Sequence, residues 1–167
     1  RRRELAFALY MTGCGAGVFM YVGLLARTMA RHFLGAPVEG KMTPTLWVHL
    51  APLSVSPRSM LALLKTTGDA ALLRYGSLVA AAFLGAALWW LVLAVSMTIR
   101  NRRQGKLPIA LSWWAFVFPI GACSVLAYRV SELLALEVLP LVASGLTLLA
   151  LFVWSAAALG TVRGSRT

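Results

Sequence analysis

Long uncharged stretches separated by short basic loops dominate the pattern of hydrophobic and polar positions along the chain. A helix that crosses a bilayer needs roughly 20 apolar residues, and four stretches reach that length: Leu5–Ala26, Tyr75–Ile99, Leu107–Tyr128 and Val138–Val162. Hydrophobic positions are continuous within each stretch, whereas the strands of a membrane β-barrel alternate hydrophobic and polar positions. The pattern therefore predicts four membrane-spanning helices.

A fifth interval, Met42–Leu64, is apolar except for His49 and Arg58, and it contains three prolines: Pro44, Pro52 and Pro57. A proline inside a helix removes a backbone hydrogen bond and bends the axis. A kinked span that faces the protein interior or an aqueous path tolerates the prolines and the charge, whereas an interfacial segment would lie along the membrane surface. We expect the kinked span, and hence five spans at residues 5–30, 44–66, 73–99, 108–130 and 136–162.

The composition excludes several classes of protein. The chain has 167 residues, of which 60% are hydrophobic and 13% are charged, and its mean hydropathy is +0.80. A soluble domain carries about a quarter charged residues, and a globule of this size could not bury so much apolar surface. We therefore exclude a soluble enzyme, a disordered tail and a disulfide-stapled secreted module. The sequence predicts an all-α integral membrane protein in contact with membrane lipids.

The net charge predicts an orientation in the membrane. Sixteen Lys and Arg residues against five Asp and Glu residues give +11, which in a soluble protein would suggest nucleic-acid binding. In a membrane protein the excess gathers in cytoplasmic loops, so we expect no nucleic-acid partner. Five spans place nine basic residues on one side and six on the other. The side of the nine, which includes the C-terminus, is predicted to be cytoplasmic in a multi-pass protein of the cell membrane.

Catalytic signals are sparse. No GxSxG, Walker-type, HExxH or CxxC motif occurs, so the common nucleophile, phosphate and metal motifs are missing. All five carboxylates fall in loops or at span ends, which argues against a proton relay inside the membrane. We therefore expect no enzyme activity, no metal and no other cofactor.

The most specific stretch is Ser112–Ala122, in which four aromatic residues precede Pro119 and Gly121. Pro119 removes a hydrogen bond one turn upstream, and Gly121 allows a neighbour to approach closely. A kink beside a bulky ring can form a hydrophobic constriction that gates a pore. The same residues also suit a kinked helix that only packs, and periodicity leaves both interpretations open.

This stretch resembles the tellurite-resistance/dicarboxylate transporter family, which includes TehA-type proteins, malate permeases, sulfite exporters and plant slow anion channels. The family's ninth helix typically reads W-W, a small residue, an aromatic residue, Thr or Ser, and F-P, similar to Trp113-Trp114-Ala115-Phe116-Val117-Phe118-Pro119 here. Val117 departs from the usual hydroxyl residue. A second patch, Pro44-Thr45-Leu46-Trp47 followed by Leu50-Ala51-Pro52, is similar to the start of the family's seventh helix.

The resemblance implies a fold of ten helices, arranged as five hairpins around a pore and assembled as a homotrimer with one pore per protomer. The chain would then cover helices six to ten, the C-terminal half, with the interval Met42–Leu64 as pore-lining helix seven. Inner helices one, three and five would be absent, so this chain alone would not enclose the pore.

The resemblance also implies passage of small anions, with chloride, nitrate, sulfite and C4-dicarboxylates such as malate as candidates. An aromatic ring of a kinked inner helix would occlude the pore: by motif this is Phe118, with Phe116 as the fallback. Arg58, which we expect to be buried in its span, and His49 would lie along the anion pathway. The candidate kink and pore-lining residues are Pro52, Pro57, Pro119 and Gly121. The alternative is a non-transporting membrane scaffold or assembly subunit, in which Phe118 is a core residue.

Overall fold

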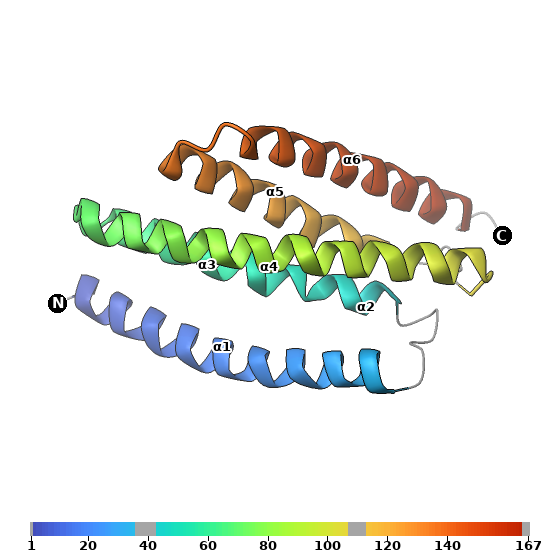
Figure 1. The fold of residues 1–167 in the computed structure, drawn as a ribbon, viewed down its shortest axis with the longest axis horizontal. Coiled ribbons are helices and arrows are strands. Elements are labelled where there is room, and N and C mark those ends of the chain that lie inside the picture. The colour runs from blue at the N-terminus through green and yellow to red at the C-terminus, as the bar shows by residue number, and fades with distance from the viewer. Residues whose placement is uncertain (1, 36–42, 107–112, 165–167) are drawn as a thin grey trace. The chain divides into compact units, whose positions relative to one another are not determined.

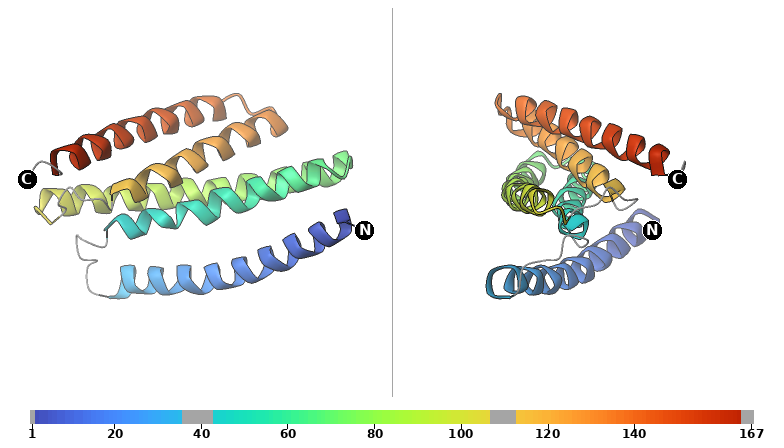
Figure 2. Two further views of the ribbon diagram at one scale, coloured as in Figure 1. Left: turned by 180° about the vertical axis from the view of Figure 1, so that it is seen from behind. Right: turned by 90° about the vertical axis from the view of Figure 1, so that its right-hand side faces the viewer.

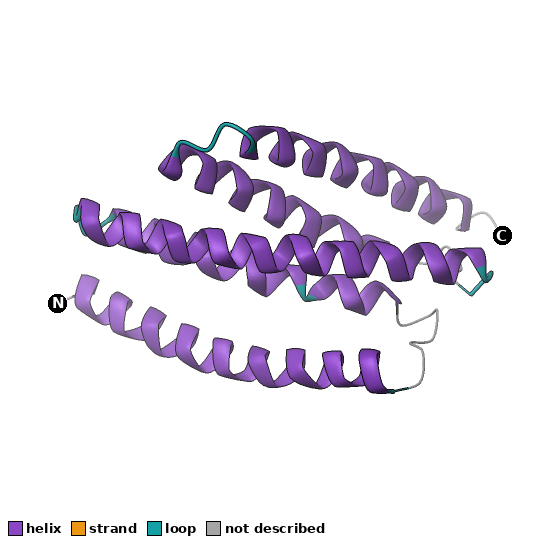
Figure 3. Cartoon of the chain, in the orientation of Figure 1, coloured by secondary structure: helices purple, strands orange, loops and turns teal. Residues whose placement is uncertain are grey.

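The computed structural model describes residues 2–35, 43–106 and 113–164, and throughout these ranges the chain forms helices joined by short turns, without a strand (Figure 3). The predicted all-α fold is therefore confirmed. The chain divides into two compact units, Arg1–Val38 and Glu39–Thr167, which are described separately here.

The first unit holds one helix, α1 (Arg2–Leu34). Its 33 residues rise about 50 Å, which exceeds the roughly 30 Å of a bilayer's hydrocarbon core. Arg31 and His32 lie in its last turn, where basic side chains complement the helix dipole. The hydroxyl of Thr12 donates to the carbonyl of Ala8, which is how a helix in lipid satisfies a hydroxyl group internally.

The described part of the second unit, residues 43–106 and 113–164, forms five helices, and Figures 1 and 2 show how they run. They are α2 (Thr43–Val48), α3 (Leu50–Lys65), α4 (Ala70–Arg103), α5 (Trp114–Leu134) and α6 (Leu139–Gly164). Helix α5 is central, because it contacts α2, α3, α4 and α6. Helices α3 and α5 run parallel to each other, and α4 and α6 return antiparallel to them. This arrangement gives two helical hairpins in tandem.

Among the residues that the structure describes, four helices are long and apolar enough to cross a membrane: Phe7–Leu34 within α1, Ala70–Arg103, Trp114–Leu134 and Leu139–Val162. Each overlaps one of the stretches predicted from hydropathy. The start of the predicted span 108–130 lies outside the described residues. The membrane boundaries of all five spans stay predictions.

The fifth predicted span, 44–66, is not one continuous helix. It consists of α2 and α3, which are separated by a turn at His49 (Figure 3). Pro52 lacks an N–H, so the carbonyl of Val48 loses the hydrogen bond that would continue the helix. Residues 43–65 together would still rise about 34 Å if they were helical throughout. The prolines therefore break this segment without making it too short to cross a bilayer.

The turn between α3 and α4 is closed by local hydrogen bonds. Gly68 adopts a left-handed conformation with φ of 72°, which glycine tolerates at no steric cost. The carboxylate of Asp69 then accepts a hydrogen bond from the backbone N–H of Leu72 at 3.0 Å and caps α4. Further along α4, Gly76 faces the side chain of Leu64, and a Cβ at this position would collide with it. These features define the turn and the close packing of the α3–α4 hairpin.

Three buried or partly buried hydrogen bonds fasten α2 to α4. The indole N–H of Trp90 donates to the carbonyl of Leu46 at 2.7 Å, and the indole N–H of Trp47 donates to the hydroxyl of Thr98 at 3.0 Å. The third joins the Asn101 amide to the Thr43 hydroxyl at 2.6 Å. The last four carbonyls of a helix lack partners within the helix, so the Leu46 carbonyl near the end of α2 gains a donor from Trp90.

We expect Trp90→Phe to lower the thermal stability of the detergent-solubilised protein. The substitution keeps most of the ring but leaves the buried Leu46 carbonyl without its donor, which costs about 1–3 kcal/mol. Differential scanning fluorimetry measures the shift in Tm. The matched control is Trp89→Phe, because Trp89 is the exposed neighbour on the same helix and exposed substitutions usually change stability by less than about 0.5 kcal/mol. Equal shifts for both variants would refute the role of this hydrogen bond.

Candidate anion pathway

The two candidate gate residues lie on opposite faces of α5. Phe116 is 3% exposed, and its ring lies 5.1 Å from the ring of Trp47 and 5.7 Å from that of Trp113. Phe118 is 65% exposed. Residues two apart on a helix project in nearly opposite directions, since each residue turns the helix by about 100°. The fallback residue is therefore a packing residue in this structure, while Phe118 lies on an open face.

The open face of α5 continues along the helix. Trp114, Phe118 and Val125 are all exposed at spacings of four and seven residues, which is the repeat of one helix face. Gly121 lies on the same face, and no atom outside its immediate surroundings comes within 4 Å of the position that a Cβ would take. Gly121 and Val125 help to line a hollow beside α6 with a volume of about 430 Å³.

Pro119 is buried within α5. Because its nitrogen carries no hydrogen, the carbonyl of Ala115 lacks its usual helical partner. The proline thus directly follows the exposed ring of Phe118, as the sequence motif requires. The helix continues beyond it to Leu134, so Pro119 modifies α5 without ending it.

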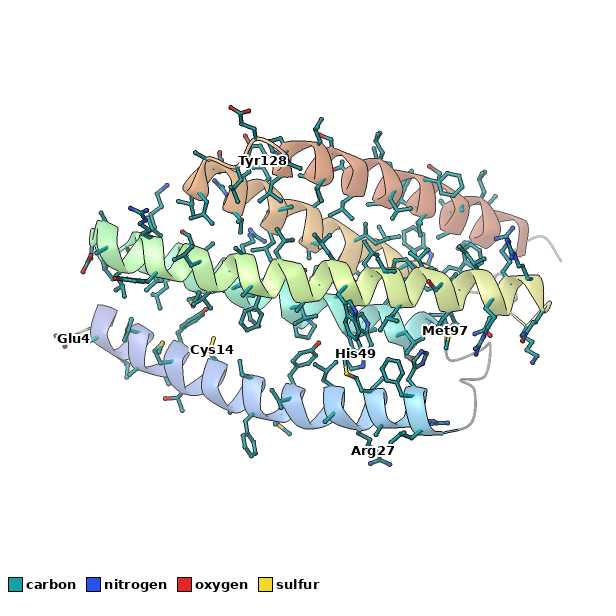
Figure 4. All side chains as sticks on the ribbon, in the orientation of Figure 1. Glu4, Cys14, Arg27, His49, Met97 and Tyr128 are labelled. Carbon is teal, nitrogen blue, oxygen red and sulfur yellow. The ribbon has the colours of Figure 1, made fainter. Side chains whose placement is uncertain are left out.

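The other predicted pathway residues lie on α3 or at its start. Pro57 is buried and Pro52 is half-buried. His49, labelled in Figure 4, lies at the turn between α2 and α3, and its ring lies 4.9 Å from that of Trp90 on α4. His49 therefore belongs to the contact between α2 and α4, and the structure does not bring it together with Arg58.

Arg58 is exposed and not buried, contrary to our expectation. It lines a cavity of about 410 Å³ at the C-terminal ends of α3 and α5, formed by Arg58, Leu61, Ala62, Lys65, Leu73, Arg129, Glu132 and Leu133. The physical reason is that Arg58 lies on a face of α3 that the described part of the second unit leaves uncovered, two turns before the helix ends at Lys65. Arg129 donates to the Glu132 carboxylate at 2.8 Å within this cavity.

The structure separates the gate candidate from this basic cavity. Both lie along α5, but position 118 precedes position 129 by three turns, or about 16 Å along the axis. Phe118 and Arg58 are therefore not parts of one contact site. Lys65 and Arg129 lie near the ends of two predicted spans, and the parallel course of α3 and α5, which brings these ends together, could not be read from local sequence.

The described residues offer no candidate metal centre. In the part of the chain that the structure describes, His, Cys, Asp and Glu side chains do not gather in groups of three or more. Both cysteines are free, and Cys123 is buried in the core. These observations leave the open face of α5 and the basic cavity as the features with functional potential.

Residues 3–162 match the family model described as voltage-dependent anion channel, SLAC1. The chain belongs to this family. The resemblance seen in the two sequence patches is therefore confirmed. The chain is a multi-pass membrane protein with several apolar helices.

Two curated proteins of Methanocaldococcus jannaschii are similar to the chain. The uncharacterized transporter MJ0762 is 30% identical over 95% of this chain and 46% of its own length. The uncharacterized transporter MJ0576 is 31% identical over 91% of this chain and 44% of its own length. The chain thus spans a little under half the length of both relatives. No solved structure matches it significantly.

The two sequence patches that pointed to the SLAC1 family meet in space. Trp47, from the patch that opens α2, packs edge-on against Phe116, from the motif that opens α5. The two patches that resemble the family therefore supply a structural contact, Trp47 against Phe116, as well as the exposed Phe118. This contact holds the broken helix pair α2–α3 against the start of α5.

Proposed function

We propose that the protein passes small anions across the membrane, as a channel or transporter, along a path lined by α3 and α5 with Phe118 as its gate. One observation carries the proposal. In a cluster of bulky side chains at the start of α5, Phe116 and Trp113 are buried whereas Phe118 remains 65% exposed, immediately before a helix proline. A ring placed in this way is free to occlude a path along that face.

The surroundings of Phe118 suit a hydrophobic gate. Gly121 follows one turn later on the same face, and side chains three apart on a helix are neighbours. Because Gly121 has no side chain, the space beside the ring stays open. An apolar ring in a narrow path can stop ion passage by excluding water as well as by filling space.

The charge distribution favours anions over cations. The chain carries sixteen basic residues and five acidic ones, and Arg58 and Lys65 lie on α3 at one end of the path. A positive field along a path raises the local concentration of anions. Chloride, nitrate, sulfite and C4-dicarboxylates such as malate are the candidates.

The proposal extends to assembly and orientation. Two lining helices leave the face of Phe118 open, so further helices would complete the wall of the path. We propose a homotrimer with one path per protomer, located in the cell membrane with its C-terminus in the cytoplasm.

Reconstitution of the full-length protein into vesicles tests the proposed function. Protein-containing vesicles loaded with one of the four candidate anions should lose it faster than protein-free vesicles with the same load. The anion with the fastest loss identifies the preferred substrate. A non-transporting scaffold predicts no flux of any of them above the level of protein-free vesicles.

A further inference from the structure

The cavity at the C-terminal ends of α3 and α5 contains more positive charge than its own carboxylate can neutralise. Arg58, Lys65 and Arg129 line it together with a single acidic side chain, Glu132. Glu132 forms its ion pair with Arg129 at 2.8 Å. The cavity is therefore left with a net charge of about +2, carried mainly by Arg58 and Lys65.

Three other charged groups near this end of the unit, Asp69, Arg74 and Glu137, do not line the cavity. The carboxylate of Asp69 is engaged with the N-terminus of α4. Arg74 follows Leu73 on α4 but lines a different hollow, together with Tyr75 and Leu78. The charge of the cavity thus comes from α3 and α5.

The lining and the volume of the cavity suit a small ligand. Leu61, Ala62 and Leu133 contribute apolar surface beside the basic groups, and its volume of about 410 Å³ lies within the range of about 300–1,000 Å³ that is usual for small-molecule sites. A guanidinium group presents a planar fork of donors that matches the oxygens of a carboxylate, nitrate or sulfite group.

We propose that Arg58, Lys65 and Arg129 form a binding site for a small oxyanion, which we call the basic vestibule. This assignment rests on the proposed function in one respect, since it makes the vestibule the place where an anion waits before or after it passes Phe118. Glu132 limits the affinity by holding Arg129, so that the anion is attracted but also released, as conduction requires.

A test that does not depend on transport measures the local potential directly. Ala62 is exposed in the vestibule, so Ala62→Cys places a thiol there, in the full-length protein with Cys14→Ala and Cys123→Ala. The thiol should react at least about tenfold faster with sulfonatoethyl methanethiosulfonate than with its trimethylammonioethyl analogue at low ionic strength, relative to a free thiol. The preference should vanish near 1 M salt, where the Debye length is about 3 Å.

Added substitutions identify the source of the potential. Arg58→Gln together with Lys65→Gln should abolish the preference for the anionic reagent. Arg74→Gln, the matched control at the same end of the unit, should leave the preference unchanged. A preference equal to that of a free thiol, or one that responds to Arg74→Gln as strongly as to the vestibule variants, would overturn the proposal.

A second test uses flux of the preferred anion through reconstituted protein at limiting anion concentration and low ionic strength. In a cavity of this size, one unit charge changes the local anion concentration by about two- to threefold. Arg58→Gln should therefore lower the flux by this factor, and Arg58→Lys should largely restore it. Glu132→Gln should raise the flux, because it releases Arg129.

The sign of the Glu132→Gln effect separates the proposal from a structural role. If the Arg129–Glu132 pair only stabilises the fold, the variant loses flux, and this result contradicts the vestibule.

Vesicles of pure phosphatidylcholine and vesicles with added phosphatidylglycerol distinguish the source of the oxyanion. If Arg58→Gln lowers the flux in both kinds of vesicle, the result supports a passing anion as the ligand. If it does so only with phosphatidylglycerol present, the result overturns the proposal in favour of a lipid headgroup. If no anion is transported but the thiol test succeeds, the proposed function fails and the binding site stands.

Discussion

Phe118→Ala is expected to raise anion flux through the reconstituted protein about tenfold or more, which requires the barrier to fall by only about 1.4 kcal/mol. The ring of Phe118 lies on the open face of α5, and its removal both widens the path and lets water enter beside Gly121. Initial rates of anion loss from vesicles, normalised to the amount of folded protein, measure the effect.

Val125→Ala is the matched control for this prediction. Val125 lies two turns after Phe118 on the same exposed face, so the control also removes apolar surface from that face but does not touch the proposed gate. Its flux should stay close to that of the unaltered protein. An unchanged flux in Phe118→Ala, or an equal rise in both variants, would rule out Phe118 as the gate.

Phe116→Ala is expected to lower the free energy of unfolding by about 3–5 kcal/mol, as is usual when a buried Phe is truncated to Ala. Phe116 is 3% exposed and lies between Trp47 and Trp113, so its loss leaves a cavity where α2 meets α5. Chemical denaturation of the detergent-solubilised protein, followed by tryptophan fluorescence, measures the change.

Measurements of stability and of flux should distinguish the roles of Phe116 and Phe118. Phe118→Ala should change the free energy of unfolding by less than about 1 kcal/mol, because its ring is mostly exposed. Phe116→Ala should reduce flux only in proportion to the loss of folded protein. Should Phe118→Ala prove the more destabilising variant, the assignment of gate and packing residue would be reversed.

Hydropathy alone predicted most of the fold, because each long apolar run must satisfy its backbone groups within a helix. The prolines of the interval Met42–Leu64 also indicated a bend. The sequence could not predict that the bend would be a break at His49, with α2 held to α4 by Trp90 and Asn101. Those partners lie 44 and 58 residues from the groups they bind, and no local pattern reports such contacts.

The candidate site, like the fold, could be predicted from the sequence only in part. The motif around Pro119 offered two phenylalanines, and only the burial of Phe116 against Trp47 distinguishes them. Arg58 was singled out as a charge within an apolar segment, but its partners were not. Lys65 and Arg129 join it because α3 and α5 run parallel and end together, which is a property of tertiary packing.

Charge selectivity tests the central claim, that this protein passes anions, most directly. Full-length protein is incorporated into a planar bilayer with a tenfold gradient of a potassium salt, using chloride, nitrate, sulfite and malate in turn. For at least one salt, the account predicts a current that reverses near the equilibrium potential of the anion, which is about 59 mV for a singly charged ion. Reversal near the potassium potential for every salt, or the absence of both a current here and anion loss from vesicles for all of them, would contradict it.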